Sequence, residues 1–197
     1  MDDHLKLEDF HANLGRYIKI SEEESGYIFS RLDSSKIPNR QFLLKQGELC
    51  TSFNMVTSGC LCNYFTDDHD IDHVLQFATK MWWTADLNSL MNNKPSKYNI
   101  RAVGDSTVLQ LTRNTWDELN DVIPQFERYF RLIFQNALIA HQKRIIQNIS
   151  ETAEQNYLKF RENYPEVEQM VPQKYIASYL GITPEFLSKI RRELASR

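Results

Sequence analysis

The sequence has few cysteines and glycines and no long hydrophobic run. No stretch approaches the roughly 18 to 20 apolar residues of a membrane span, and the first ten residues lack the basic and apolar regions of a secretory signal. We therefore expect a cytoplasmic protein with no membrane partner. The three cysteines, Cys50, Cys60 and Cys62, are an odd number and lack the paired spacing of zinc sites. We interpret them as small hydrophobic residues in strands rather than as a disulfide framework.

Motifs of enzymes and metal sites are also missing. The sequence has no G-x-S-x-G, no phosphate-binding loop and no cysteine–histidine pair in the context of a nucleophile, so an enzyme is not predicted. The segment "TDDHDIDH" at 66–73 offers two histidines among four aspartates. On strands, His69 and His73 would not share the helical face of a metalloprotease motif, and the segment lacks the glycine and glutamate of a calcium loop. We interpret it as a solvated hairpin tip and predict no metal site.

Charge is distributed unevenly along the chain. The whole sequence carries 23 basic and 26 acidic side chains, a net charge of −3. Residues 170–197 contain five basic and two acidic side chains, a balance of +3, which leaves −6 for the remainder. This asymmetry is typical of a DNA-binding end attached to an acidic regulatory body.

Hydrophobic periodicity divides the chain into three parts. Short β-rich runs between turn residues fill 38–112, after an N-terminal segment with helical spacing, and the period becomes helical again from Ile123. The predicted fold class is α+β: an antiparallel β-roll of jelly-roll type with flanking helices, a long helix and a C-terminal helical domain. We place these parts at 1–122, 123–149 and 150–197.

The long helix carries two neighbouring apolar stripes. The first consists of Phe126, Phe130, Ile133, Ala137 and Ala140, and the second of Phe134, Leu138, His141, Ile145 and Ile149. One stripe can pack on the roll while the other meets the same helix of a second copy, which predicts a homodimer. A single broad stripe that faces one core is the alternative interpretation.

The segment "YIASYLGITPEFLSKIRREL" at 175–194 fits a helix-turn-helix. Gly181 stands at the turn, where a left-handed backbone is needed, and Thr183 and Pro184 form the start signal of a second helix. Apolar residues occupy the positions that hold two such helices together. A helical hairpin that only packs is the alternative interpretation.

The polar remainder of this segment predicts contacts with double-stranded DNA. Glu185, Ser188 and Lys189 have the chemistry to read base edges. Basic side chains beside them would contact phosphates and orient the protein. The predicted DNA-binding residues are Lys174, Thr183, Pro184, Glu185, Ser188, Lys189, Arg191 and Arg192.

On these motifs the sequence resembles the Crp/Fnr family of bacterial transcription regulators. The resemblance rests on "LLKQGE" followed by "FNMVTSG", on "IRAVGDSTVLQLTRNTWDEL", on the long helix and on "QKYIASYLGITPEFLSKIRREL". It implies a cyclic-nucleotide-binding-like roll, a dimerisation helix and a winged helix-turn-helix that binds a pseudo-palindromic operator. RNA polymerase is a further implied partner. Where family members often carry an arginine, this sequence has Pro184, so base preference is not carried over.

The effector site that the resemblance implies is altered in this sequence. Members that bind a cyclic nucleotide use a Gly-Glu pair, which reads Ala85-Asp86 here, and Arg101-Ala102 falls within a β-like run. Alanine restricts a backbone that must approach a phosphate, which argues against the usual cyclic-nucleotide mode. No cofactor is assigned, and the identity of an effector, or its existence, stays open.

A pocket between the roll and the long helix, lined by aromatic residues such as Trp82, is the candidate effector site. The predicted effector residues are Trp83, Ala85, Asp86, Tyr98 and Arg101. These aromatics can also be ordinary core residues. The competing function is a small-molecule-binding β-roll receptor whose C-terminal helices mediate protein contacts.

Overall fold

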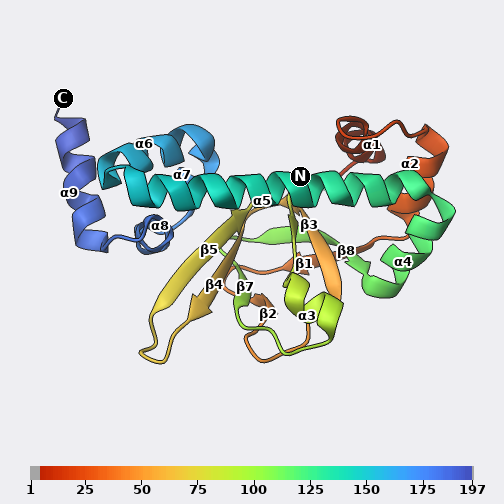
Figure 1. The fold of residues 1–197 in the computed structure, drawn as a ribbon, viewed down its shortest axis with the longest axis horizontal. Coiled ribbons are helices and arrows are strands. Elements are labelled where there is room, and N and C mark those ends of the chain that lie inside the picture. The colour runs from red at the N-terminus through yellow and green to blue at the C-terminus, as the bar shows by residue number, and fades with distance from the viewer. Residues whose placement is uncertain (1–4, 197) are drawn as a thin grey trace.

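The computed structural model describes residues 5–196, in which a β-roll lies against one long helix that runs across the whole molecule (Figure 1). Two helices precede the roll, α1 (Leu7–Gly15) and α2 (Glu22–Ser30). A capping box starts α2, because the Ser21 hydroxyl accepts from the Glu24 N–H and the Glu24 carboxylate accepts from the Ser21 N–H. The predicted helical segment at the N-terminal side is therefore confirmed as two short helices.

The β-roll consists, within the described residues, of two four-stranded sheets. Their strand orders are β1-β8-β3-β6 and β2-β7-β4-β5, and every strand pair is antiparallel. The bounds are β1 Asp33–Ile37, β2 Phe42–Leu44, β3 Ser52–Ser58, β4 Leu61–Thr66, β5 Asp72–Ala78, β6 Trp83–Thr84, β7 Asn99–Ala102 and β8 Ser106–Thr112, with helix α3, Leu87–Asn92, between β6 and β7. The predicted antiparallel β-roll is confirmed.

The core of the roll continues beneath the first half of the long helix, α5 (Pro124–Ser150), which α4 (Arg113–Val122) connects to β8. The ring centroids of Phe53 in β3 and Phe130 in α5 are 5.0 Å apart, and those of Trp83 in β6 and Phe130 are 5.1 Å apart. Each such side chain contributes about 1.5–3 kcal/mol by leaving water. Roll and helix therefore share one core.

The two halves of α5 have different surroundings. Its first half buries Phe126, Tyr129 and Phe130 against the roll. Its second half exposes a set of large apolar side chains, namely Leu138, Ile139, Ile145, Ile146 and Ile149. The first predicted stripe is thus seated on the roll at Phe126 and Phe130, whereas most of the second stripe is exposed in the single chain.

Four helices follow α5 and fold back beside the roll (Figure 1). Their bounds are α6 Ala153–Asn163, α7 Pro165–Met170, α8 Gln173–Leu180 and α9 Pro184–Ala195. The helix-turn-helix is present, but the predicted wing has no counterpart in residues 113–196, where every element is helical. Pro165 begins a further helix, and α9 stays helical to Ala195.

The C-terminal helices, α6 to α9, pack on the outer side of β4 and β5. A second apolar cluster combines strand residues such as Cys62 and Phe77 with helix residues such as Phe160 and Ile176. The Ser178 hydroxyl of α8 accepts from the Val74 N–H at 2.9 Å and donates to the Asp72 carbonyl at 2.7 Å. Because the strand has polar backbone groups to satisfy here, one serine ties α8 to β5.

The segment 66–73 joins β4 to β5 as a turn. Asp67 Oδ1 accepts from the N–H groups of His69 and Ile71, and Asp67 Oδ2 lies 2.8 Å from Nε2 of His73. The interpretation as a hairpin tip is confirmed. The three cysteines are buried and free, as interpreted, but only Cys62 lies in a strand, β4, whereas Cys50 and Cys60 lie just before β3 and β4. In the part of the chain that the structure describes, no helix has the length and apolar character to cross a membrane.

Candidate DNA-binding surface and effector cavity

The turn between α8 and α9 has the backbone that a helix-turn-helix needs. Gly181 adopts φ 70°, a left-handed conformation that favours glycine. Two residues later the Thr183 side chain accepts from the Phe186 N–H at 3.2 Å, and Pro184 occupies the first turn of α9. The local sequence thus fixes where α8 ends and where α9 begins.

The contact between α8 and α9 is made by the apolar positions that the motif predicts. The buried side chains are Ile176, Ala177, Leu180, Leu187 and Ile190. Ala177 is fully buried, which allows the two helices to cross closely. Ile182, the packing position within the turn, is only partly buried against the same cluster, and the other packing positions of the predicted motif are confirmed.

The remaining positions of α9 form one exposed face. At about 100° per residue, this face spans Pro184 to Arg192. Its members are Pro184, Glu185, Ser188, Lys189 and Arg192, all exposed. Ser188 donates within the helix to the Pro184 carbonyl at 2.9 Å, and Lys189 lies 3.9 Å from Glu193. Both contacts are weak enough in water to exchange for contacts with a ligand.

Two further predicted residues lie away from this face. Arg191 points toward α7 and pairs with Glu168 at 3.5 Å, while Glu168 also accepts from the hydroxyl of Tyr157 at 2.8 Å. Lys174 stands in the first turn of α8, with its ammonium 4.8 Å from the Tyr175 ring. The structure therefore gives Arg191 a partner inside the C-terminal helices and leaves Lys174 at the far end of α8.

One exposed aromatic beside this face was missed. The Phe186 side chain, in the first turn of α9, is 46% exposed. The motif leaves this position unconstrained, so the sequence pattern gave no signal for it. An exposed aromatic next to polar side chains is a common feature of contact surfaces.

Three of the predicted effector residues form an internal hydrogen-bonded cluster at the start of α3. The buried Asp86 carboxylate accepts from the Ser89 N–H at 3.0 Å, the Ser96 hydroxyl at 2.8 Å and the Lys97 N–H at 3.3 Å. The Tyr98 hydroxyl donates to the Ala85 carbonyl at 2.8 Å, and burial raises the pKa of this hydroxyl. Asp86 therefore acts as the N-cap of α3.

The other two predicted effector residues lie apart. Arg101 of β7 donates through Nε to the Arg40 carbonyl at 3.1 Å and stacks over Phe42. Trp83 donates through its indole N–H to the Tyr129 hydroxyl at 2.9 Å, which in turn donates to Asn13 at 2.8 Å. The structure does not bring the five predicted residues together.

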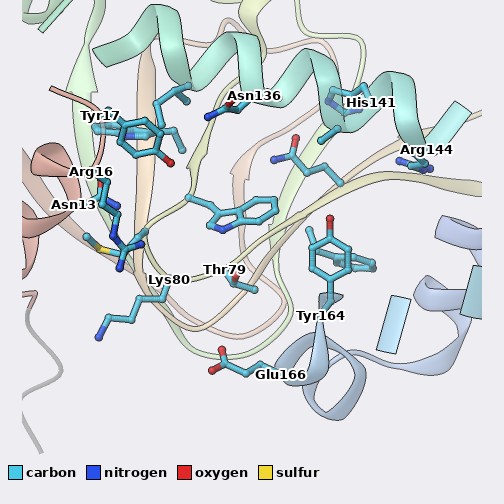
Figure 2. Close-up of a pocket in the computed structure, with 18 of the residues that line it drawn as sticks. Asn13, Arg16, Tyr17, Thr79, Lys80, Asn136, His141, Arg144, Tyr164 and Glu166 are labelled. Atoms are coloured by element: carbon cyan, nitrogen blue, oxygen red, sulfur yellow. The ribbon is translucent and has the colours of Figure 1, made fainter. Parts of the chain in front are cut away.

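A cavity of about 740 Å³ lies between the roll, α1, α5 and the C-terminal helices (Figure 2). We call it the α5 cavity. Its lining includes Trp82 and Trp83, as the predicted pocket between roll and long helix requires, but none of the other four predicted effector residues. The α5 side chains that face it are Ile133, Asn136, Ala137, Ala140, His141 and Arg144.

Arg144 connects three elements at one end of this cavity. Its guanidinium donates to the carbonyls of Val74 and Tyr179 at 3.1 Å each, and to that of Leu75. It also lies 4.0 Å from the centre of the Tyr179 ring. Burial, together with the charge of Arg144, lowers the pKa of the neighbouring His141. This imidazole is consequently neutral at pH 7.

Comparisons with known proteins agree with this architecture. Residues 35–121 match the family model of the cyclic nucleotide-binding domain. A comparison with curated proteins finds no match. Among solved structures, FixK2 from Bradyrhizobium japonicum has a TM-score of 0.73 at 14% identity, covering 84% of this chain and 85% of its own.

Two further structures are similar over most of their length. The c-di-GMP responsive global regulator CLP of Xanthomonas campestris has a TM-score of 0.73 at 10% identity, with 89% of this chain and 92% of CLP covered. The catabolite activator protein of Thermus thermophilus has a TM-score of 0.59 at 17% identity, with 93% and 87% covered.

The roll thus resembles a cyclic nucleotide-binding domain in sequence, and its two antiparallel sheets agree with this resemblance. The chain as a whole has the fold of Crp/Fnr transcription regulators, and the predicted resemblance to that family is confirmed.

Proposed function

We propose that this protein is a homodimeric, sequence-specific DNA-binding transcription regulator of the Crp/Fnr type. The observation that carries the proposal is a helix-turn-helix whose packing positions in α8 and α9 are buried while the polar face of α9 is exposed. A helix with this arrangement can enter the major groove and present side chains to base edges. Such a regulator would act in the cytoplasm, with RNA polymerase as a further partner.

The second half of α5 supports the dimer. At about 100° per residue, its exposed side chains fall within an arc of about 120°. These side chains are Leu138, Ile139, Gln142, Ile145, Ile146 and Ile149, and five of the six are apolar. An apolar stripe of this length is costly in water and is typical of an interface between helices. Pairing it with its own copy would produce a two-fold axis along α5.

A two-fold axis gives the proposal a geometric consequence. The two α9 helices would enter successive major grooves about 34 Å apart on a pseudo-palindrome. Glu185, Ser188 and Lys189 are the base-reading candidates, whereas Lys174 and Arg192 are candidates for phosphate contacts. Thr183 and Pro184 hold the start of α9.

Selection of bound duplexes from a random pool, followed by a salt titration of the selected duplex, tests the function. We expect a recurrent pseudo-palindrome and an affinity that falls steeply with salt, since phosphate contacts release counterions. The double variant Glu185→Ala, Lys189→Ala should lose sequence preference and remain dimeric. The matched control is Lys94→Ala, Glu127→Ala, which removes the same charges from exposed positions elsewhere.

An absence of duplex binding at low salt, or an affinity insensitive to salt, would favour the competing function. In that case the roll is a small-molecule receptor and the C-terminal helices contact another protein. Loss of sequence preference in the control variant as well would show that α9 does not read DNA.

A further inference from the structure

The α5 cavity is built from elements on both sides of the molecule. The roll contributes the segment from β5 to β6, α1 contributes one wall, and α7 and α8 contribute residues such as Glu166 and Tyr179. A volume of about 740 Å³ is within the range of small-molecule sites. A molecule in this cavity would contact the roll and the C-terminal helices at once.

On one side of the cavity, a chain of hydrogen bonds fixes which end of the Asn13 amide is a free donor. The indole N–H of Trp83 can only donate, so the Tyr129 hydroxyl accepts from it and donates to Oδ1 of Asn13. Asn13 is 6% exposed, and its Nδ2 has no hydrogen-bond partner among residues 5–196. Because Asn13 lines the cavity, this amide N–H is free to donate to an acceptor bound there.

Two cations stand on the same side as this amide. Figure 2 shows Arg16 and Lys80 gathered near Asn13, at the opposite side from Tyr164 and Arg144. Among the described residues, no carboxylate forms an ion pair with Arg16, Lys80 or Arg144. Asn13, Arg16 and Lys80 together provide hydrogen-bond donors with net positive charge.

The negative charges of the acidic lining residues are stabilised by helix N-termini. Asp9 and Glu166 stand in the first turns of α1 and α7, where the positive end of a helix offsets a carboxylate. Asp9 lies one helical turn before Asn13, but it forms no ion pair with Arg16 or Lys80, so this side of the cavity has two positive charges against one negative and favours an anionic group.

The rest of the lining is aromatic and apolar. Trp82 is 40% exposed and meets Tyr164 edge-on, with ring centroids 5.9 Å apart. Ala137 and Ala140 have small side chains, so the adjoining surface of α5 leaves space in the cavity. A flat ring can lie between this surface and Trp82 while its charged group reaches Asn13, Arg16 and Lys80.

We propose that the α5 cavity binds an aromatic anion, held by the donors of α1 and Lys80 and by the aromatic side chains, and that this ligand holds the C-terminal helices to the roll. The regulatory consequence rests on the proposed function, whereas the binding does not. On α5 the residues that face the cavity lie opposite the exposed apolar stripe, so pairing of two α5 helices leaves the cavity open. The site also differs from the cluster of Ala85, Asp86 and Tyr98.

Calorimetric titration with 2-naphthoate, and with the neutral 2-naphthamide as its matched probe, tests the binding. We expect 2-naphthoate to bind more tightly. The double variant Arg16→Gln, Lys80→Gln should weaken 2-naphthoate about tenfold or more and leave 2-naphthamide within about twofold, since only the anion uses the lost charges. Ala137→Trp should block both probes by filling the cavity, with circular dichroism to confirm its fold.

The control is Lys36→Gln, Lys94→Gln, which removes two exposed charges outside the cavity lining and should leave the binding of both probes unchanged. The proposal is overturned if 2-naphthoate does not bind, if 2-naphthamide binds equally well, if the control weakens binding as much, or if Ala137→Trp has no effect.

Hydrogen exchange at the Val74 N–H reports on the second half of the proposal, because Ser178 of α8 accepts from this group. If the cavity exists only while α8 is seated on β5, a 2-naphthoate concentration about nine times its dissociation constant should slow this exchange about tenfold. Unchanged exchange under saturating 2-naphthoate would refute the coupling. Duplex binding without the probe is measured separately, so failure of the proposed function and failure of this site are distinguishable.

Discussion

Replacement of Arg144 by methionine would measure how firmly the C-terminal helices are held to the roll. The guanidinium donates to three carbonyls, two on β5 and one at the end of α8, and stacks on Tyr179. Methionine keeps an unbranched apolar side chain of similar length but has no donor. The variant therefore removes the polar connection and retains much of the packing.

The magnitude follows from these contacts. Hydrogen bonds to a charged group contribute about 1.5–3 kcal/mol each when buried, but Arg144 is half-buried and the three carbonyls regain water when the contact opens. The stacking adds about 0.5–1 kcal/mol. We expect a total loss of about 2–3 kcal/mol, a factor of about 30 to 150 in the equilibrium between seated and released helices.

Native-state hydrogen exchange at the Val74 N–H is the assay, since this group is protected by Ser178 only while α8 is seated. Exchange should accelerate by that factor in Arg144→Met. The control is Lys143→Met at the neighbouring exposed position. Unchanged exchange in Arg144→Met, or an equal acceleration in the control, would refute the role of Arg144.

Three other expectations concern the dimer, the start of α9 and a buried thiol. Ile145→Arg should make the protein monomeric in sedimentation velocity, whereas Asn148→Arg, outside the exposed stripe, should leave it dimeric. Thr183→Ala should lower the free energy of unfolding by about 1 kcal/mol in urea, and Thr183→Ser should restore it. Burial raises the pKa of Cys60 from 9.0 to about 12. Its thiol ionises first in the unfolded chain, so the free energy of unfolding should fall as pH rises from 9 to 12, and Cys60→Ala should remove this part of the slope. A slope that Cys60→Ala leaves unchanged would assign the effect to another group.

The helix-turn-helix and the roll were predictable because their signals are local. Gly181, Thr183 and Pro184 each impose a backbone conformation on their own position, so the turn and the start of α9 follow from neighbouring residues. In the roll, short β-rich runs between turn residues predict strands, although β3 and β4 are buried along almost their whole length instead of alternating. The two stripes of α5 follow from helical periodicity in the same way.

The surroundings of the predicted effector residues could not be predicted, because they depend on tertiary contacts. Nothing near Asp86 in the sequence shows that Ser96 and Lys97 will saturate its carboxylate. Arg144 has no partner of opposite charge, since it binds backbone carbonyls, which every residue has. The wing was carried over from the family resemblance alone, and residues 113–196 contain only helices.

The contact between Ser178 and β5 has a consequence for solubility. β5 is the outermost strand of its sheet, and its unpaired backbone groups would otherwise be a template for another chain. Ser178 and Arg144 use these groups, and the C-terminal helices cover Cys62 and Phe77 beside them. Removing residues 151–197 should therefore leave a roll that self-associates through β5, which light scattering would detect. The helices proposed to bind DNA would thus also protect the sheet from aggregation.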